Sequence, residues 1–188
     1  MKETEGKGKD IEKLVAELKG RVDSLAKSST ANKLVLICFS GELDKALAAF
    51  IIATGAAAMG MDVVMFFTFW ATPLLRDKKK KVGGKDLMSK MFGVMLPKGV
   101  ATLKLSKMNM AGMGTAMMKR LMKKKNVASL EDMLALAAEL EIRIFICEMS
   151  MDLMGIRREE IIDYPGLESV GVATFLAHAG ESSIQLFL

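Results

Sequence analysis

Short apolar runs alternate along the chain with longer segments of helical periodicity. The apolar runs are rich in β-branched and aromatic residues, which predicts buried strands at 33–39, 62–69, 141–147 and 183–188, with a further candidate at 101–105. Helices are predicted at 43–60, 130–140 and 170–179. Strands and helices in this alternating order favour an α/β protein with a mostly parallel sheet and helices on both faces.

The chain begins with a segment of different character, residues 1–32. Apolar residues fall on one helical stripe between positions 10 and 27, namely Ile11, Leu14, Val15, Leu18, Val22 and Leu25. Ile11, Leu18 and Leu25 are seven residues apart, a spacing that allows a short coiled coil. Packing of this helix against the chain's own domain is an equal alternative. We therefore expect a disordered tail at 1–10 and an amphipathic helix ahead of one domain at 33–188.

Residues 71–126 interrupt the α/β pattern with lysines, glycines and methionines, and we interpret them as an insertion that covers a pocket or forms a subunit contact. The net charge of +5 and the pI of about 9.2 come mostly from Lys78–Lys81 and from residues 119–125. Such basic patches suit an acidic protein, an anionic substrate or a membrane surface. No nucleic acid is expected, because aromatic residues do not alternate with the lysines.

The apolar segment Ala46–Met61 raises the question of a membrane span. Its sixteen residues fall short of the roughly 20 that a bilayer requires, and Asp62 ends it, so we expect a buried helix. Two cysteines make no disulfide framework, and residues 1–10 lack the apolar stretch of a signal peptide. These features predict a cytoplasmic protein.

Cys147 is the strongest candidate for chemistry. It ends an apolar strand, and ligands of open α/β sheets bind beyond the carboxyl ends of the strands. Free N–H groups of a following helix would stabilise a thiolate there, and Ser150 or Asp152 could cap that helix. The alternative is a buried, unreactive cysteine.

Cys38, near the end of the first strand, could share this edge and exchange sulfur or a disulfide with Cys147, or it could be a core residue. The segment Ser40–Lys45 matches neither a P-loop nor GxGxxG, so no nucleotide or flavin is expected. His178 is the only histidine and is expected at the surface. With one histidine and two distant cysteines, no metal site is expected either.

Several longer strings are distinctive: residues 40–46, 56–63, 66–70, 105–110 with 112–115, and 147–156. In these strings the chain, from about residue 33 to 188, resembles the longer branch of the DsrE/DsrF family, which is part of the DsrEFH superfamily. Members of this branch are often labelled peroxiredoxin-like or membrane-associated. The resemblance implies a flavodoxin-like, three-layer α/β/α sandwich with a five-stranded parallel sheet. It also implies a homo-oligomer that works in cytoplasmic sulfur trafficking with TusA-like and rhodanese-like partners.

The resemblance implies that Cys147 bears the sulfur, whereas many relatives have another residue at position 38. From their places in the sequence, we predict that Cys38 assists Cys147 and that the supporting or substrate-binding residues are Ser40, Gly41, Met149, Ser150 and Asp152. The leading hypothesis is a sulfurtransferase or persulfide carrier that takes sulfane sulfur from thiosulfate, a polysulfide or a partner. One alternative is a non-catalytic oligomeric scaffold that docks partners through the insertion and the N-terminal helix. Another is a Cys38/Cys147 thiol-disulfide oxidoreductase. The insertion could also make a peripheral membrane contact.

Overall fold

The chain divides into two compact units, residues 1–31 and 32–188. The structure, a computed structural model, describes residues 13–23, 31–80, 82–84 and 86–188. In the first unit residues 13–23 form a helix on which Leu14, Leu18 and Val22 are exposed. The rest of the predicted helix, with Ile11 and Leu25, and the predicted tail lie outside the described residues.

Five strands form one sheet in the second unit: β1 (Ala31–Cys38), β2 (Asp62–Phe67), β3 (Arg143–Cys147), β4 (Leu167–Val170) and β5 (Ser182–Phe187). Their order is β4-β3-β2-β1-β5, and the pairs from β1 to β4 are all parallel. Ser183 Oγ donates to the Lys33 carbonyl and the Leu188 N–H to that of Ile37, so β5 also runs parallel to β1. As in flavodoxin-like sheets, the order reverses direction once, although here the last strand lies beyond β1.

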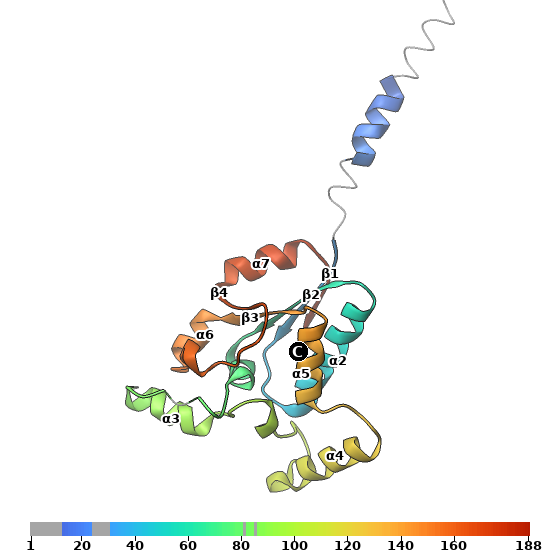
Figure 1. Ribbon diagram of the computed structural model, residues 1–188. Helices are drawn as coiled ribbons and strands as arrows, with labels where there is room; N and C mark the ends of the chain where they lie inside the picture. Colours follow the sequence, from blue (N-terminus) through green and yellow to red (C-terminus); the bar gives the residue numbers. More distant parts are fainter. Residues whose placement is uncertain (1–12, 24–30, 81, 85) are drawn as a thin grey trace, which may run out of the picture. The chain divides into compact units, whose positions relative to one another are not determined.

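Helices cover both faces of this sheet (Figure 1). On one face, α2 (Leu43–Ala58) and α5 (Leu130–Glu139) pack on strand residues such as Leu36 and Met65. On the other face, α7 (Val172–Gly180) packs on residues that alternate with these, such as Val35 and Phe66. The predicted three-layer α/β/α sandwich is confirmed.

Two sequence predictions are wrong in detail. The candidate strand at 101–105 is instead a 3-10 turn, Val100–Thr102, followed by extended backbone with a buried Leu103. The fifth strand is β4, a four-residue element that the predicted helix at 170–179 partly overlapped. The apolar segment after β1 forms α2, and among the described residues no helix is long and apolar enough to cross a membrane.

The insertion at 71–126 begins where β2 ends, so it lies at the carboxyl end of the sheet. It contains most of the 3-10 helix η1 (Phe69–Leu75), then α3 (Leu87–Met95), a 3-10 turn at Met110–Gly112 and α4 (Met113–Lys124), and Figure 1 shows α3 and α4 at the same end of the domain. Arg76 anchors it to the body. Its guanidinium forms a 2.9 Å ion pair with Glu160, both side chains being 5% exposed, and it also donates to the Gly93 and Pro97 carbonyls.

This anchor predicts that Arg76→Ala lowers the free energy of unfolding by about 3 kcal/mol, because the substitution breaks the buried Arg76–Glu160 ion pair and removes the bonds to the Gly93 and Pro97 carbonyls. Residues 87–99 should become more sensitive to limited proteolysis. Lys98→Ala is the matched control, since the Lys98 side chain is exposed, and it should change stability by less than about 0.5 kcal/mol in chemical denaturation. Equal stability of the two variants would contradict the anchoring role.

Candidate functional site

The carboxyl ends of the central strands meet at one edge of the sheet. There β1 continues into Ser40 and Gly41, β2 into Thr68, and β3 ends at Cys147. The Thr68 N–H donates to the Cys38 carbonyl at 3.0 Å, which holds the first two strand ends together. This is the edge at which parallel α/β sheets bind ligands.

Cys147 is the last residue of β3 and the N-cap residue of α6 (Glu148–Leu153). It pairs with Val170 of β4, and its side chain is 1% exposed. It belongs to the apolar cluster on the α7 face of the sheet, together with Phe66, Phe145 and Phe175. The thiol is therefore at the expected edge, but it lies beneath the layer that α7 forms.

Contacts of two kinds, aromatic and polar, hold α7 on the sheet. Phe175 stacks on Phe66 with ring centroids 4.7 Å apart. Lys33, which is 3% exposed, donates to His178 Nδ1 at 2.6 Å and to Glu181 at 3.1 Å. Partial burial and then the charge of Lys33 lower the pKa of His178, so the ring is a neutral acceptor at pH 7. The histidine that we expected at the surface is thus a half-buried partner of the sheet.

Cys38 ends β1 on the opposite face of the sheet, within the cluster of α2 and α5. Burial raises the pKa of its thiol to about 12, so it stays protonated at neutral pH. One strand, β2, lies between the two cysteine-bearing strands. Two strand spacings of about 4.8 Å each already exceed the roughly 7 Å that a disulfide allows between Cα atoms. The geometry therefore argues against the predicted exchange between Cys38 and Cys147 within one chain.

The supporting residues after β3 separate into buried and exposed positions. Ser150 is fully buried, accepts a hydrogen bond from the Phe69 N–H at 3.0 Å and shares a second with Thr68 Oγ1 at 2.8 Å. These bonds fasten α6 to the end of β2. Met149 and Asp152 are exposed on the same short helix.

The supporting residues after β1 shape the turn into α2. Ser40 Oγ accepts a hydrogen bond from Lys45 Nζ at 3.1 Å. Gly41 lies against the Trp70 backbone, where any Cβ would collide with the carbonyl oxygen. Among the described residues, no three His, Cys, Asp or Glu side chains gather as metal ligands would.

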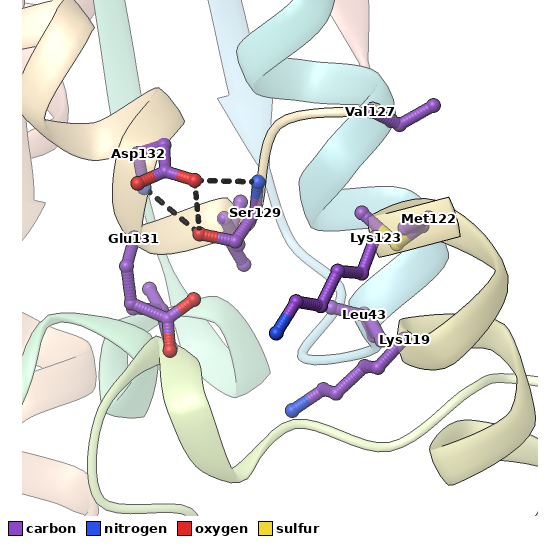
Figure 2. Close-up of a pocket in the computed structure, with 10 residues that line it drawn as sticks. Leu43, Lys119, Met122, Lys123, Val127, Ser129, Glu131 and Asp132 are labelled. Carbon is purple, nitrogen blue, oxygen red and sulfur yellow. Dashed lines mark hydrogen bonds between the residues drawn. The ribbon is translucent and has the colours of Figure 1, made fainter. Parts of the chain in front are cut away.

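A cavity that the sequence did not reveal lies between α4 and α5 (Figure 2). It has a volume of about 390 Å³, with Leu43, Val100 and Leu130 among its apolar lining residues. Lys119 and Lys123 extend into it from α4, and Glu131 faces them from α5. No local sequence signal marks this cavity, because residues of three separate segments form it.

A second concavity, the Met groove, has a volume of about 480 Å³. Its lining is formed largely by thioether side chains of the insertion: Met108, Met110, Met113, Met117 and Met118. Flexible methionines of this kind suit adaptable binding surfaces. Cys147 is part of neither this groove nor the cavity of Figure 2.

The fold defines a parallel α/β protein with two cysteines at the edge where such sheets bind ligands, one on each face of the sheet. The model of the DsrE/DsrF/DrsH-like family matches residues 30–187, which include both cysteines and the whole insertion. The chain belongs to this family.

This chain aligns with two relatives over nearly their whole length. The uncharacterized protein YrkE of Bacillus subtilis is 43% identical over 156 residues, which are 83% of this chain and 96% of that protein. The sulfur carrier protein DsrE2 of Allochromatium vinosum is 41% identical over 160 residues, 83% of this chain and 98% of that protein. The crystal structure of ychN from E. coli aligns with a TM-score of 0.47 at 12% identity, over 83% of this chain and 98% of that one. Membership in the family and the sulfur-carrier relative support a role in sulfur relay in general.

The cover over Cys147 leads to a prediction about thiol access. Phe175→Ala should raise the rate at which a neutral maleimide labels Cys147 at least about tenfold and should lower the free energy of unfolding by about 3 kcal/mol, because it leaves a cavity under α7. Leu176→Ala, one residue along the same helix but 58% exposed, is the control and should leave both quantities nearly unchanged. Equal labelling of both variants would show that α7 does not limit access.

The burial of Cys38 leads to a prediction about its pH dependence. With a pKa raised to about 12, Cys38 stays a thiol, and iodoacetamide should leave it unmodified in the native protein at pH 9. Peptide mass mapping after alkylation would test this, with the unfolded protein in guanidinium as the control in which both cysteines react. Rapid native modification of Cys38 at pH 8 would contradict it.

Proposed function

We propose that this protein is a persulfide carrier, or sulfurtransferase, in which Cys147 holds sulfane sulfur. The observation that carries the proposal is the position of Cys147 at the carboxyl end of β3, in a chain 41% identical to a sulfur carrier protein. Strand-end residues of parallel sheets are the ones that face ligands. Cys38 also ends a strand, but it lies on the opposite face of the sheet, where burial keeps its thiol protonated at neutral pH.

The transfer needs only thiolate chemistry. The Cys147 thiolate attacks the outer sulfur of thiosulfate, the bond between the two thiosulfate sulfurs breaks, and sulfite leaves with that electron pair. Cys147 then holds a persulfide anion. A thiolate of an acceptor protein attacks the outer sulfur, takes it as a new persulfide, and restores the Cys147 thiolate. A polysulfide or a persulfide on a partner can replace thiosulfate as donor, and no external oxidant is required.

Burial shapes how this carrier works. At 1% exposure the sulfur of Cys147 meets no donor in the closed arrangement, so the cover formed by α7 has to open for each loading and unloading step. Between those steps the same apolar surroundings shield a persulfide from small thiols in solution. A protected thiol of this kind suits transfer between proteins better than free turnover of small molecules.

The partners in this proposal are other sulfur carriers, of the TusA-like and rhodanese-like kinds. Both present a cysteine that gives or accepts sulfane sulfur, as the resemblance of the sequence implies. The protein acts in the cytoplasm in this scheme, where thiols stay reduced.

Intact-protein mass spectrometry after incubation with thiosulfate or polysulfide tests the proposal. Wild-type protein should gain a reductant-sensitive adduct, of about 32 Da for each persulfide sulfur, and Cys147→Ser should lose it completely, because serine provides no sulfur nucleophile. Cys38→Ser is the matched control and should load as the wild type does. The Phe175→Ala variant should load faster, because its cover is weakened.

Two results would count against the proposal. An adduct that persists in Cys147→Ser would place the sulfur elsewhere in the chain. Absence of loading in both the wild type and Phe175→Ala, with small donors and with a persulfidated rhodanese, would favour a non-catalytic scaffold.

A further inference from the structure

The charges of the chain are segregated along the sequence far more than its net charge of +5 suggests. Residues 71–126 contain fifteen lysines or arginines and only two aspartates. Residues 127–188 contain three arginines and eleven aspartates or glutamates. One chain therefore presents a strongly basic segment and a strongly acidic one, and a separation of this size favours association between complementary surfaces.

The basic segment has an apolar surface that nothing in the described chain covers. On α4, Met113 and Met117 are 66% and 67% exposed, and both line the Met groove. Arg120 and Lys124 are four residues apart and, by the helical repeat, lie beside these methionines. No ion pair is found for either cation among the described side chains.

The acidic segment has a matching surface on α6, directly after Cys147. Met149 is 54% exposed and Leu153 is 64% exposed, and these two residues lie one helical turn apart. Glu148 and Asp152 are also exposed one turn apart, beside them. Within the described residues neither carboxylate has a cationic partner.

We propose that the Met groove and basic edge of α4 in one copy of this chain dock on the α6 surface of a second copy. Apolar side chains then cover one another, and Arg120 and Lys124 meet Glu148 and Asp152. Each copy carries both halves of the contact, so two copies related by a two-fold axis satisfy both at once, as a closed assembly requires. A concave groove with an acidic counterpart in the same chain favours this occupant over an anionic membrane, which would leave α6 uncovered.

The contact completes the thiol site with residues of the partner copy. Glu148 follows Cys147 directly, so cations that dock on it bring positive charge beside the thiol. Such charge would attract an anionic donor such as thiosulfate and stabilise the persulfide anion. This consequence rests on the proposed function of Cys147, whereas the docking itself does not.

Charge reversal on both sides tests the docking in the full chain. The Arg120→Glu/Lys124→Glu and Glu148→Lys/Asp152→Lys variants should each weaken self-association at least about tenfold in sedimentation velocity, because like charges face each other. The variant with all four substitutions restores opposite charges and should recover most of the association. Misfolding cannot explain such a recovery. Glu139→Lys/Glu168→Lys, an equal change in charge at two other exposed positions, is the control and should associate as the wild type does.

Three results would overturn the docking: a wild type that stays monomeric at its highest soluble concentration, a fourfold variant no better than the double variants, or a control as weak as they are. A monomer that binds phosphatidylglycerol vesicles but not phosphatidylcholine vesicles would assign the basic surface to a membrane instead. Cys147→Ser should self-associate normally. Failure of sulfur loading and failure of docking are thus separate results.

Discussion

Successive side chains of a β-strand point to opposite faces of the sheet, and this alternation decides the chemistry available to the two cysteines. Cys38 and Cys147 both end parallel strands, so both lie at the same edge. The alternation nevertheless sends one into the α2 and α5 layer and the other into the α7 layer. The two strand-end cysteines are therefore separate thiols: Cys38 is protonated at neutral pH, and Cys147 lies beside the surface helix α6.

The same layering explains why access to Cys147 depends on α7. The connections from β1 through β4 place α2 and α5 on one face of the sheet, whereas the single reversal of strand order leaves α7 as the helix that crosses back over the other face. That face is therefore thinly covered, and Phe175 with the Lys33–His178 contact holds the cover in place. A thin cover held by a few contacts can open locally at a lower free energy than the rest of the fold. In the proposed function, this cover protects the Cys147 thiol and exposes it when it opens.

Much of this arrangement could be predicted from the sequence, because long apolar runs identify central strands with little ambiguity. The strand that ends at Cys147 and the alternation with helices follow from residues 33–69 and 141–147 alone. The four-residue β4 could not be found this way, since it contains too few residues for a period-two pattern to stand out. The separation of the cysteines also required the strand order, which no local pattern encodes. The sequence also did not indicate that the Ser150 hydroxyl is buried and hydrogen-bonded to Thr68.

The insertion shows how charge and topology work together at this edge. A long segment placed between β2 and α5 emerges at the carboxyl end of the sheet, where the strand-end thiol also lies. Its lysines repel one another, which opposes collapse of the segment onto itself, and its exposed methionines lack partners within the described chain. An acidic, partly apolar surface that covers the segment reduces both the repulsion among the lysines and the exposure of the methionines to water. Because the acidic residues lie in the last third of the same chain, one gene product supplies both surfaces, and association can bring the basic one to the thiol.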